Sequence, residues 1–203
     1  SEGLGNEVIN PIAQIANTNN NTDVHKIGGS LGLTYEINDN FSVSSRFQGN
    51  YAEVDGYSFA KTQFYGSGKV FNIARNSVFE ELNIFRDYTF DAFLTYKNTF
   101  ADKHNVNVVL ANSVFRTTGS FRSFTGFDIP GDNGNNASIA NAGEVIDNNV
   151  NGGNTFDARL LSYFTRIQYD YEGKYLFSGV IRRDGSTKFG PDNKFGYFPS
   201  ASA

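Results

Sequence analysis

Residues 182–184 form a candidate binding site, because two arginines and an aspartate follow one another there. A guanidinium group makes paired hydrogen bonds with carboxylates and phosphates, so Arg182, Arg183 and Asp184 could contact an anionic ligand or a partner protein. The alternative is an ion-pair cluster within the chain that orders the loop after it. We favour the ion-pair cluster and keep ligand contact as a hypothesis.

A glycine-rich segment, Gly66 to Lys69, resembles the end of a phosphate-binding loop. Such a loop needs an earlier glycine for the backbone cradle and a hydroxyl after the lysine to reach magnesium. Gln63 stands in place of that glycine and Val70 in place of the hydroxyl. The segment therefore predicts a turn and no nucleotide site.

Residues 147–158 resemble a calcium-binding loop in their first half only. Ala158 takes the twelfth position, where a bidentate carboxylate is required, although Asp157 is adjacent. Calcium binding there stays open, and a polar loop without a metal is the favoured interpretation. His25 and His104 are far apart in sequence, which favours polar surface over a metal or general-base role for either.

No set of residues predicts catalysis. Glu80 and Glu81 are neighbours, so on a strand they point to opposite sides and cannot form the facing carboxylate pair of a glycosidase. The chain has no cysteine, which excludes disulfides, thiolate metal sites and cysteine nucleophiles. We expect no enzyme activity, no metal and no cofactor.

Charge and hydropathy narrow the class of protein further. The formal charge is -4 and no basic block is present, so nucleic acid is not an expected partner. Mean hydropathy is -0.40, and the longest aliphatic run, residues 108–111, is far shorter than the ~20 apolar residues of a spanning helix. Strands that face lipid with every second residue keep mean hydropathy low.

Alternation of apolar and polar residues predicts the elements that must position these side chains. Pairs of alternating segments flank short polar turns and predict three β-hairpins, with turns at 38–40, 101–104 and 172–174. In the last hairpin, tyrosines crowd around the turn. A three-residue turn at 172–174 would pair Tyr171 with Tyr175 and keep Tyr175, Phe177 and Ile181 on the apolar side, whereas a two-residue turn would pair Tyr171 with Lys174.

Long connections alternate with the tight turns. Residues 52–85 predict a loop, with a small strand at 57–65 and a helical turn near Phe79 as options, and glycine- and asparagine-rich residues 119–155 predict a large exposed loop. This asymmetry, together with strands of ~10 alternating residues, is typical of outer-membrane barrels, whose short turns are periplasmic. The fold prediction is therefore all-β, an antiparallel transmembrane β-barrel segment.

The two faces of the predicted strands differ in polarity. We expect the apolar row to meet lipid (Leu31, Leu33, Tyr35, Val106, Val108, Leu110, Tyr163, Ile167, Tyr169) and the polar row to face the lumen (Thr34, Glu36, Arg46, Gln48, Arg166, Gln168, Asp170). Patterning alone leaves open a soluble antiparallel sheet whose polar face meets solvent.

The last forty-odd residues resemble a stretch typical of the SusC-like TonB-dependent transporters. The resemblance rests on Ser162 to Arg166, Tyr169 to Tyr171, Ile181 to Gly190 and Tyr197 to Ala203, with weaker similarity at Asn10 to Ala13 and Thr95 to Phe100. These segments span nearly the whole chain in family order. The resemblance implies that residues 1–203 are about seven strands of a plugged barrel of about 22 strands, with the plug domain and the rest of the barrel absent.

The resemblance also implies a function at the cell outer membrane: import of oligosaccharides or oligopeptides with a SusD-like surface lipoprotein, driven by the TonB complex through the plug. Outer-membrane lipid would surround the wall. The chain has no Met and shows no charged segment followed by an apolar one at its start, so we expect an internal fragment. Two alternatives are a soluble β-sheet carbohydrate-binding module and a passive porin.

Overall fold

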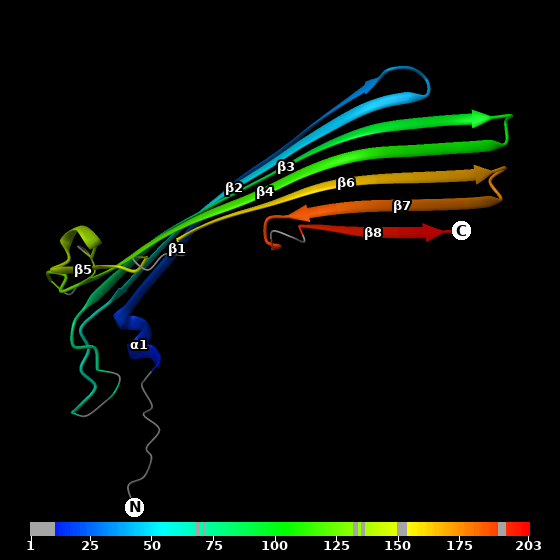
Figure 1. Ribbon diagram of the computed structural model, residues 1–203. Coiled ribbons are helices and arrows are strands. Elements are labelled where there is room, and N and C mark those ends of the chain that lie inside the picture. The colour runs from blue at the N-terminus through cyan, green and yellow to red at the C-terminus, as the bar shows by residue number, and fades with distance from the viewer. Residues whose placement is uncertain are drawn as a thin grey trace, which may run out of the picture. The chain divides into compact units, whose positions relative to one another are not determined.

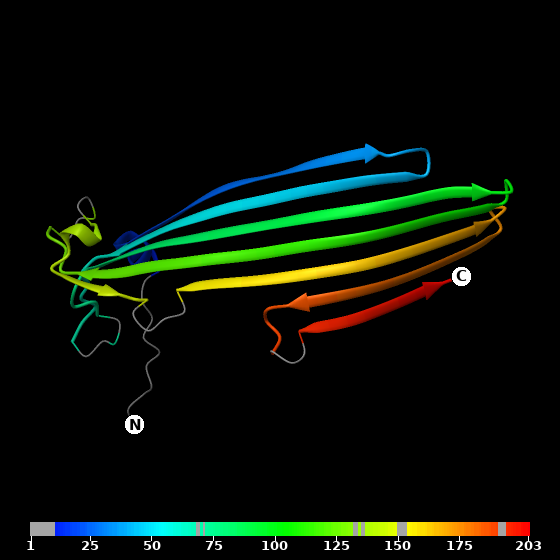
Figure 2. The same ribbon diagram turned by 45° about the horizontal axis from the view of Figure 1, so that its top comes forward.

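The computed structural model describes residues 11–67, 70, 72–131, 134, 137–149, 154–190 and 194–203. In the described residues the strands form one antiparallel sheet in the order β1-β2-β3-β4-β6-β7-β8, and β5 pairs with β4 outside this path (Figures 1 and 2). Neighbours along the path follow each other in the chain, except that the short β5 lies between β4 and β6, as expected for successive hairpins. The elements are α1 (Pro11–Asn17), β1 (Thr18–Glu36), β2 (Phe41–Ala60), β3 (Ser77–Phe100), β4 (His104–Phe127), the 3-10 turn η1 (Ile139–Asn141), β5 (Glu144–Asp147), β6 (Thr155–Tyr171), β7 (Tyr175–Ser186) and β8 (Phe195–Ser202).

The chain divides into two compact units, each described by itself. Unit 2 comprises Lys26–Tyr51, Phe85–Thr118 and Phe156–Ala203, and it holds the three tight turns. Unit 1 comprises Ser1–His25, Ala52–Ile84 and Gly119–Thr155, and it holds the long connections. No helix in the described residues is both long and apolar enough to cross a membrane.

The tight turns of unit 2 lie where the sequence predicts them. The side-chain oxygen of Asn38 accepts hydrogen bonds from the backbone N–H groups of Asn40 and Phe41, each at 2.9 Å, and these bonds close the first turn. The third turn has three residues, because Tyr171 pairs directly with Tyr175. The three-residue option is therefore confirmed, and Gly173 takes the left-handed φ of 68° that this turn requires.

Two neighbouring turns of unit 2 are joined by hydrogen bonds and ion pairs. The backbone N–H of Glu172 donates to the carbonyl of Lys103 at 2.9 Å, and the Glu172 carboxylate pairs with Lys103 at 2.9 Å and with Lys174 at 3.1 Å. Hydrogen bonds from Lys103, which has the larger effect, and from Lys174 hold the pKa of the Glu172 carboxyl below its usual range. The turns are thus fixed in register with each other.

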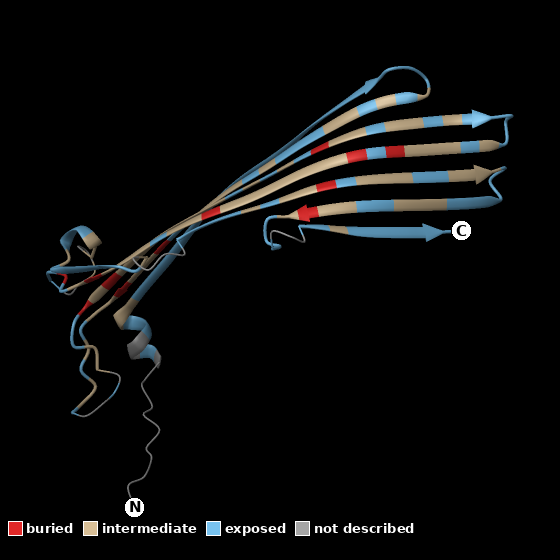
Figure 3. Ribbon diagram, viewed as in Figure 1, coloured by how far each residue is buried: buried red, intermediate tan, exposed pale blue. Residues whose placement is uncertain are grey.

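Unit 2 buries little of its apolar surface (Figure 3). Leu31, Leu33 and Tyr35 alternate along β1 with 66%, 67% and 70% of their surface exposed, and Ile167 and Ile181 are 50% and 51% exposed. These residues all belong to the apolar face, and no second layer of the described chain covers it. A sheet face of this kind is unfavourable in water and suits a lipid environment.

Unit 1 has a small core of its own. Phe59, Val78 and Ile129 are buried together, and four partly buried residues pack against them (Tyr57, Ala137, Ile139, Ala142). A side chain at Gly126 would meet Val78, Ile139 and Ala142, so this glycine permits a close approach rather than a turn. Burial, with Glu80 nearby, raises the pKa of Tyr57.

Two loop predictions are wrong over part of their length, and the helical turn considered near Phe79 is wrong, because Phe79 lies in β3. β4 continues to Phe127 and β5 pairs with it, so residues 119–155 are not simply an exposed loop. Within 52–85, β2 continues to Ala60 and β3 begins at Ser77, and the pairing among the described residues between them is an isolated bridge, Gln63 to Ile73. These strands continue beyond the alternating stretch because backbone hydrogen bonds between neighbouring strands hold them together. Such pairing does not require apolar side chains on either face. Residues 132, 133, 135, 136 and 150–153 of the predicted loop lie outside the described residues.

Candidate functional site

The polar face of unit 2 is crossed by a chain of charged hydrogen bonds at mid-strand. The carboxylate of Asp91 in β3 accepts from Nη2 of Arg46 in β2 at 2.8 Å and from the hydroxyl of Ser113 in β4 at 2.6 Å. Asp91 is 8% exposed, whereas the Arg46 side chain is 58% exposed. The aspartate therefore fixes the orientation of an arginine whose remaining donors stay open to a solute.

The candidate residues 182–184 divide between the two faces, because successive strand residues alternate. On the polar face, Nε of Arg182 donates to the Asp184 carboxylate at 2.7 and 2.8 Å, and Nη2 reaches the hydroxyl of buried Ser162 at 3.4 Å. Arg183 lies on the opposite face, paired across the strands with Tyr197. The structure therefore has the ion pair that we favoured, but it joins only two of the three residues.

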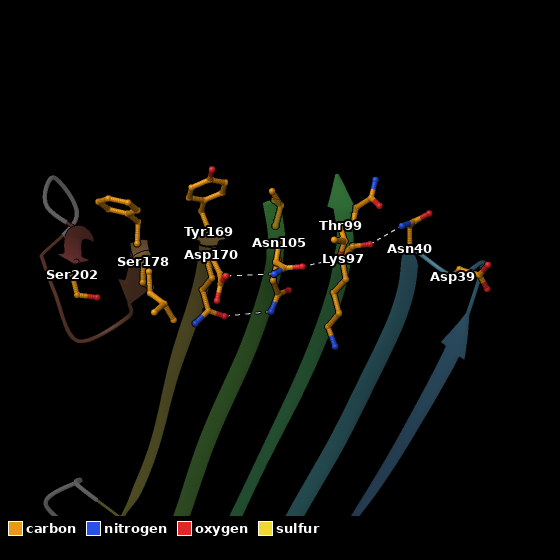
Figure 4. Close-up of a pocket in the computed structure, with 15 residues that line it drawn as sticks. Asp39, Asn40, Lys97, Thr99, Asn105, Tyr169, Asp170, Ser178 and Ser202 are labelled. Atoms are coloured by element: carbon orange, nitrogen blue, oxygen red, sulfur yellow. Dashed lines mark hydrogen bonds between the residues drawn. The ribbon is translucent and has the colours of Figure 1, made fainter. Parts of the chain in front are cut away.

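The turn end of the polar face forms a shallow hollow of about 660 Å³. Its walls carry amides, hydroxyls and charged groups from several strands (Figure 4; Asp39, Asn40, Lys97, Thr99, Asn105, Asn107, Gln168, Asp170, Ser178, Ser202). Hydrogen bonds between strands order them: Thr99 to Asn105 at 2.7 Å, Asn105 to Asp170 at 3.4 Å, and Asn107 to Gln168 at 3.3 Å. The lining also includes apolar side chains such as Leu176 and Phe177, so the hollow offers a solute hydrogen-bonding groups beside apolar contacts.

The apolar face carries an aromatic row close to the tight turns. His104 and Tyr171 have ring centroids 5.0 Å apart, and Tyr169 stacks near Phe177 at 6.3 Å. Nδ1 of His104 and the Tyr169 hydroxyl are 2.7 Å apart. The prediction of plain polar surface for His104 missed this contact, although its position next to a turn of an apolar-faced strand was the available signal.

Unit 1 has a surface ion-pair cluster that the sequence reasoning did not identify. Arg75 contacts both carboxylate oxygens of Asp128, at 2.9 and 2.5 Å, and the carboxylate of Glu144 at 2.6 Å. Its guanidinium also lies 4.8 Å from the centre of the Phe127 ring. The Arg75 guanidinium lowers the pKa of Asp128, and the two carboxylates raise the pKa of Arg75. Asp128 has a left-handed φ of 59°, so the cluster holds a sharp change of chain direction.

The described residues contain no group of three or more His, Cys, Asp or Glu side chains placed to bind a metal ion. Residues 150–153 of the calcium-loop hypothesis and residues 68 and 69 of the phosphate-loop comparison lie outside the described residues. At the described end of the calcium loop, the Asp157 carboxylate bonds to Arg116 and Arg159.

No family model matches the sequence. Among curated proteins, the chain is similar to TonB-dependent receptor P39 of Formosa agariphila, with 34% identity over 123 residues, which are 60% of this chain and 11% of the relative. It is 23% identical over its whole length to TonB-dependent receptor P26 of the same organism, covering 20% of it. It is 25% identical over 199 residues to TonB-dependent receptor SusC of Bacteroides thetaiotaomicron, covering 94% of this chain and 18% of the relative. The chain thus spans between 11% and 20% of the length of these relatives.

The fold is similar to part of a solved transporter. The structure of the RagAB peptide transporter matches 92% of this chain and 20% of its own chain with a TM-score of 0.76 and 13% identity. The RagAB peptide importer in its open-open state matches with a TM-score of 0.75 and 14% identity. The resemblance to SusC-like TonB-dependent receptors is confirmed along the chain, and so is the fold, a segment of an antiparallel barrel like that of a RagA-type transporter. These relatives are receptors and transporters, not enzymes.

Proposed function

We propose that the chain forms part of the wall of an outer-membrane, TonB-dependent importer. The observation that carries the proposal is the contrast between the faces of unit 2. One face exposes apolar side chains at alternate positions, and the other orders polar side chains across neighbouring strands. Lipid would meet the first face and the solute passage the second.

Sidedness follows from the hairpins. The turns at 38–40, 101–104 and 172–174 would lie at the periplasmic end, and the long connections 52–84 and 119–155 would be extracellular. β1 and β8 end the strand order in the described residues. Their free edges would pair with further strands of the same protein, because an open edge within a bilayer leaves backbone groups without hydrogen bonds.

Substrate and partners belong to the whole protein. Oligosaccharides and oligopeptides both fit the hydroxyl, amide and mixed-charge chemistry of the polar face. A SusD-like lipoprotein would cover the extracellular side, and TonB would act through a plug supplied by residues outside this chain. The similarity to a receptor named SusC and to a peptide transporter supports this assignment.

The proposal is tested by labelling adjacent residues of β6 in the full-length receptor. Single cysteines are placed at Ile167 (Ile167→Cys) and at Gln168 (Gln168→Cys) in a background without other cysteines, and isolated outer membranes are treated with a hydrophilic maleimide. We expect labelling at 168 and protection at 167. Equal labelling at both positions would support a soluble sheet and overturn the barrel assignment.

Energy coupling and partner binding need separate measurements. Uptake by the full-length receptor should stop when TonB is deleted, whereas continued uptake would indicate a passive porin. Replacing residues 137–149 with a flexible linker of equal length should abolish co-purification of the surface lipoprotein while the barrel remains folded. Unchanged co-purification would remove this connection from the lipoprotein interface.

A further inference from the structure

The charged side chains on the apolar face of unit 2 are confined to the strand ends farthest from the tight turns. Alternate residues of each strand belong to this face. Among the strand residues of unit 2 that lie on it, the charged ones are Arg86, Arg116, Asp157, Arg159 and Arg183. Contacts with aromatic rings of the same face support this placement: the Arg86 guanidinium lies 5.8 Å from the ring centre of Tyr51, and the Arg183 guanidinium lies 5.6 Å from the ring centre of Tyr197. Four arginines against one aspartate make this end of the face cationic.

The arginines lie near or above the top of the apolar band of the membrane if the tight turns are periplasmic. Arg183 is eight residues beyond Tyr175 in β7, which is about 26 Å along a strand at about 3.3 Å per residue. A strand tilt of about 40° reduces this to about 20 Å, near the top of an apolar band about 25 Å tall. Arg159, twelve residues from Tyr171 in β6, lies about 30 Å above the tyrosines by the same reckoning. Both arginines therefore face the outer leaflet.

Arg183 has ring partners but no anionic one. Its guanidinium lies 4.0 Å from the centre of the Phe195 ring. Its Nε is buried without a hydrogen-bond partner, and no ion pair involves Arg183 in the described residues. Aromatic faces leave the in-plane N–H groups of a guanidinium free for an anion.

An apolar hollow adjoins this guanidinium. It measures about 350 Å³, and its lining includes Leu110, Tyr163, Ile181 and Tyr197 from four strands as well as Arg183 itself. A hydrocarbon chain fits such a lining, and the arginine at its edge would meet the charged group to which the chain is attached.

Arg116 and Arg159 form a second cationic position on this face, and hydrogen bonds to Asp157 hold both side chains in place. The Asp157 carboxylate accepts from Nε and Nη2 of Arg116 at 3.0 and 2.8 Å, and from Nε and Nη2 of Arg159 at 3.3 and 2.7 Å. One carboxylate thus holds two guanidiniums in place and neutralises only one of them. The Arg159 side chain remains 58% exposed.

We propose that this face binds a phosphorylated glycolipid of the outer leaflet, with Arg183 on a phosphate, an acyl chain in the hollow beside Tyr163 and Ile181, and Arg116 and Arg159 on the outer part of the head group. The inference rests on the proposed barrel, because it requires this face to meet the membrane. Charge complementarity selects the ligand: several phosphates match several arginines, and the apolar hollow selects a lipid over free phosphate.

The test is a titration of bis-phosphorylated lipid A into the detergent-solubilised full-length receptor. Arg183→Gln should weaken binding about tenfold, since it removes a charge-assisted contact. Arg182→Gln is the matched control, because the neighbouring arginine lies on the polar face, and it should bind like the unchanged protein. Dephosphorylated lipid A should bind more weakly, and inorganic phosphate should not compete.

Arg159→Gln provides a second variant if Arg183→Gln fails to fold, and it should also weaken binding. Normal binding by the folded arginine variants, equal loss in Arg182→Gln, or equal affinity for dephosphorylated lipid A would overturn the lipid site. Competition by inorganic phosphate would show an anion site without lipid selectivity and would overturn it too. These results are independent of maleimide labelling at 167 and 168, so the lipid site can fail while the barrel assignment stands.

Discussion

We expect the side chain of Asn76 to stabilise the core of unit 1. It is 6% exposed, its side-chain N–H donates to the carbonyl of Ile129 at 2.8 Å, and its side-chain oxygen accepts the Ile129 N–H at 2.7 Å. Asn76→Leu removes both hydrogen bonds and leaves two backbone groups without these partners. Ile129 is itself 4% exposed, so water cannot readily replace them.

The expected cost follows from the number of groups left unsatisfied. Each buried donor or acceptor without a partner costs about 1–3 kcal/mol, so two give about 2–6 kcal/mol of local stability. The lower value corresponds to about 30-fold faster exchange of the protected amide.

Hydrogen exchange of the full-length receptor in detergent, read at peptides that contain Ile129, measures this effect. Asn148→Leu is the control, because Asn148 is exposed in the same unit and its side chain bonds to the half-buried Thr125 rather than to Ile129. Its exchange at Ile129 should match that of the unchanged protein. If Asn76→Leu leaves exchange at Ile129 unchanged as well, the side-chain hydrogen bonds do not hold this core together.

Three further changes test other features. Phe59→Ala removes a large side chain that is 1% exposed in unit 1 and should cost about 3–5 kcal/mol, seen as rapid proteolysis of the connections while the rest of the barrel stays protected. Lowering pH should loosen the Arg75 cluster: the pKa of Asp128 is depressed in the folded state, so its contribution is present above the ordinary pKa of an aspartate and is lost as pH falls through the folded value. Exchange near residue 128 should therefore accelerate in acid, and pH-independent exchange would contradict the linkage. Gly173→Val should lower the free energy of unfolding of the refolded receptor by about 1–2 kcal/mol, because φ is 68° there, and the urea midpoint should fall with it. Gly179→Ala, in open space at ordinary φ, should change the midpoint little.

Alternation of residue types alone located the tight turns and the two faces. The turns at 38–40, 101–104 and 172–174 and the opposite placement of Ile167 and Gln168 follow from a period of two, which any half-buried strand imposes. Similarity to known motifs then indicated the barrel. The same alternation predicted strands that are too short. β3 and β4 extend beyond their alternating stretches, where neither face needs to be apolar.

Only the tertiary structure decided which side chains meet. Residues 182–184 are adjacent in sequence, yet strand pairing places Arg183 beside Tyr197 and joins Arg182 to Ser162 on the other face. Arg116 and Asp157 are 41 residues apart and form an ion pair because β4 and β6 are neighbours in the sheet. Local sequence fixes the face on which a strand residue lies, but the register between strands fixes its partner, and register depends on contacts between distant segments.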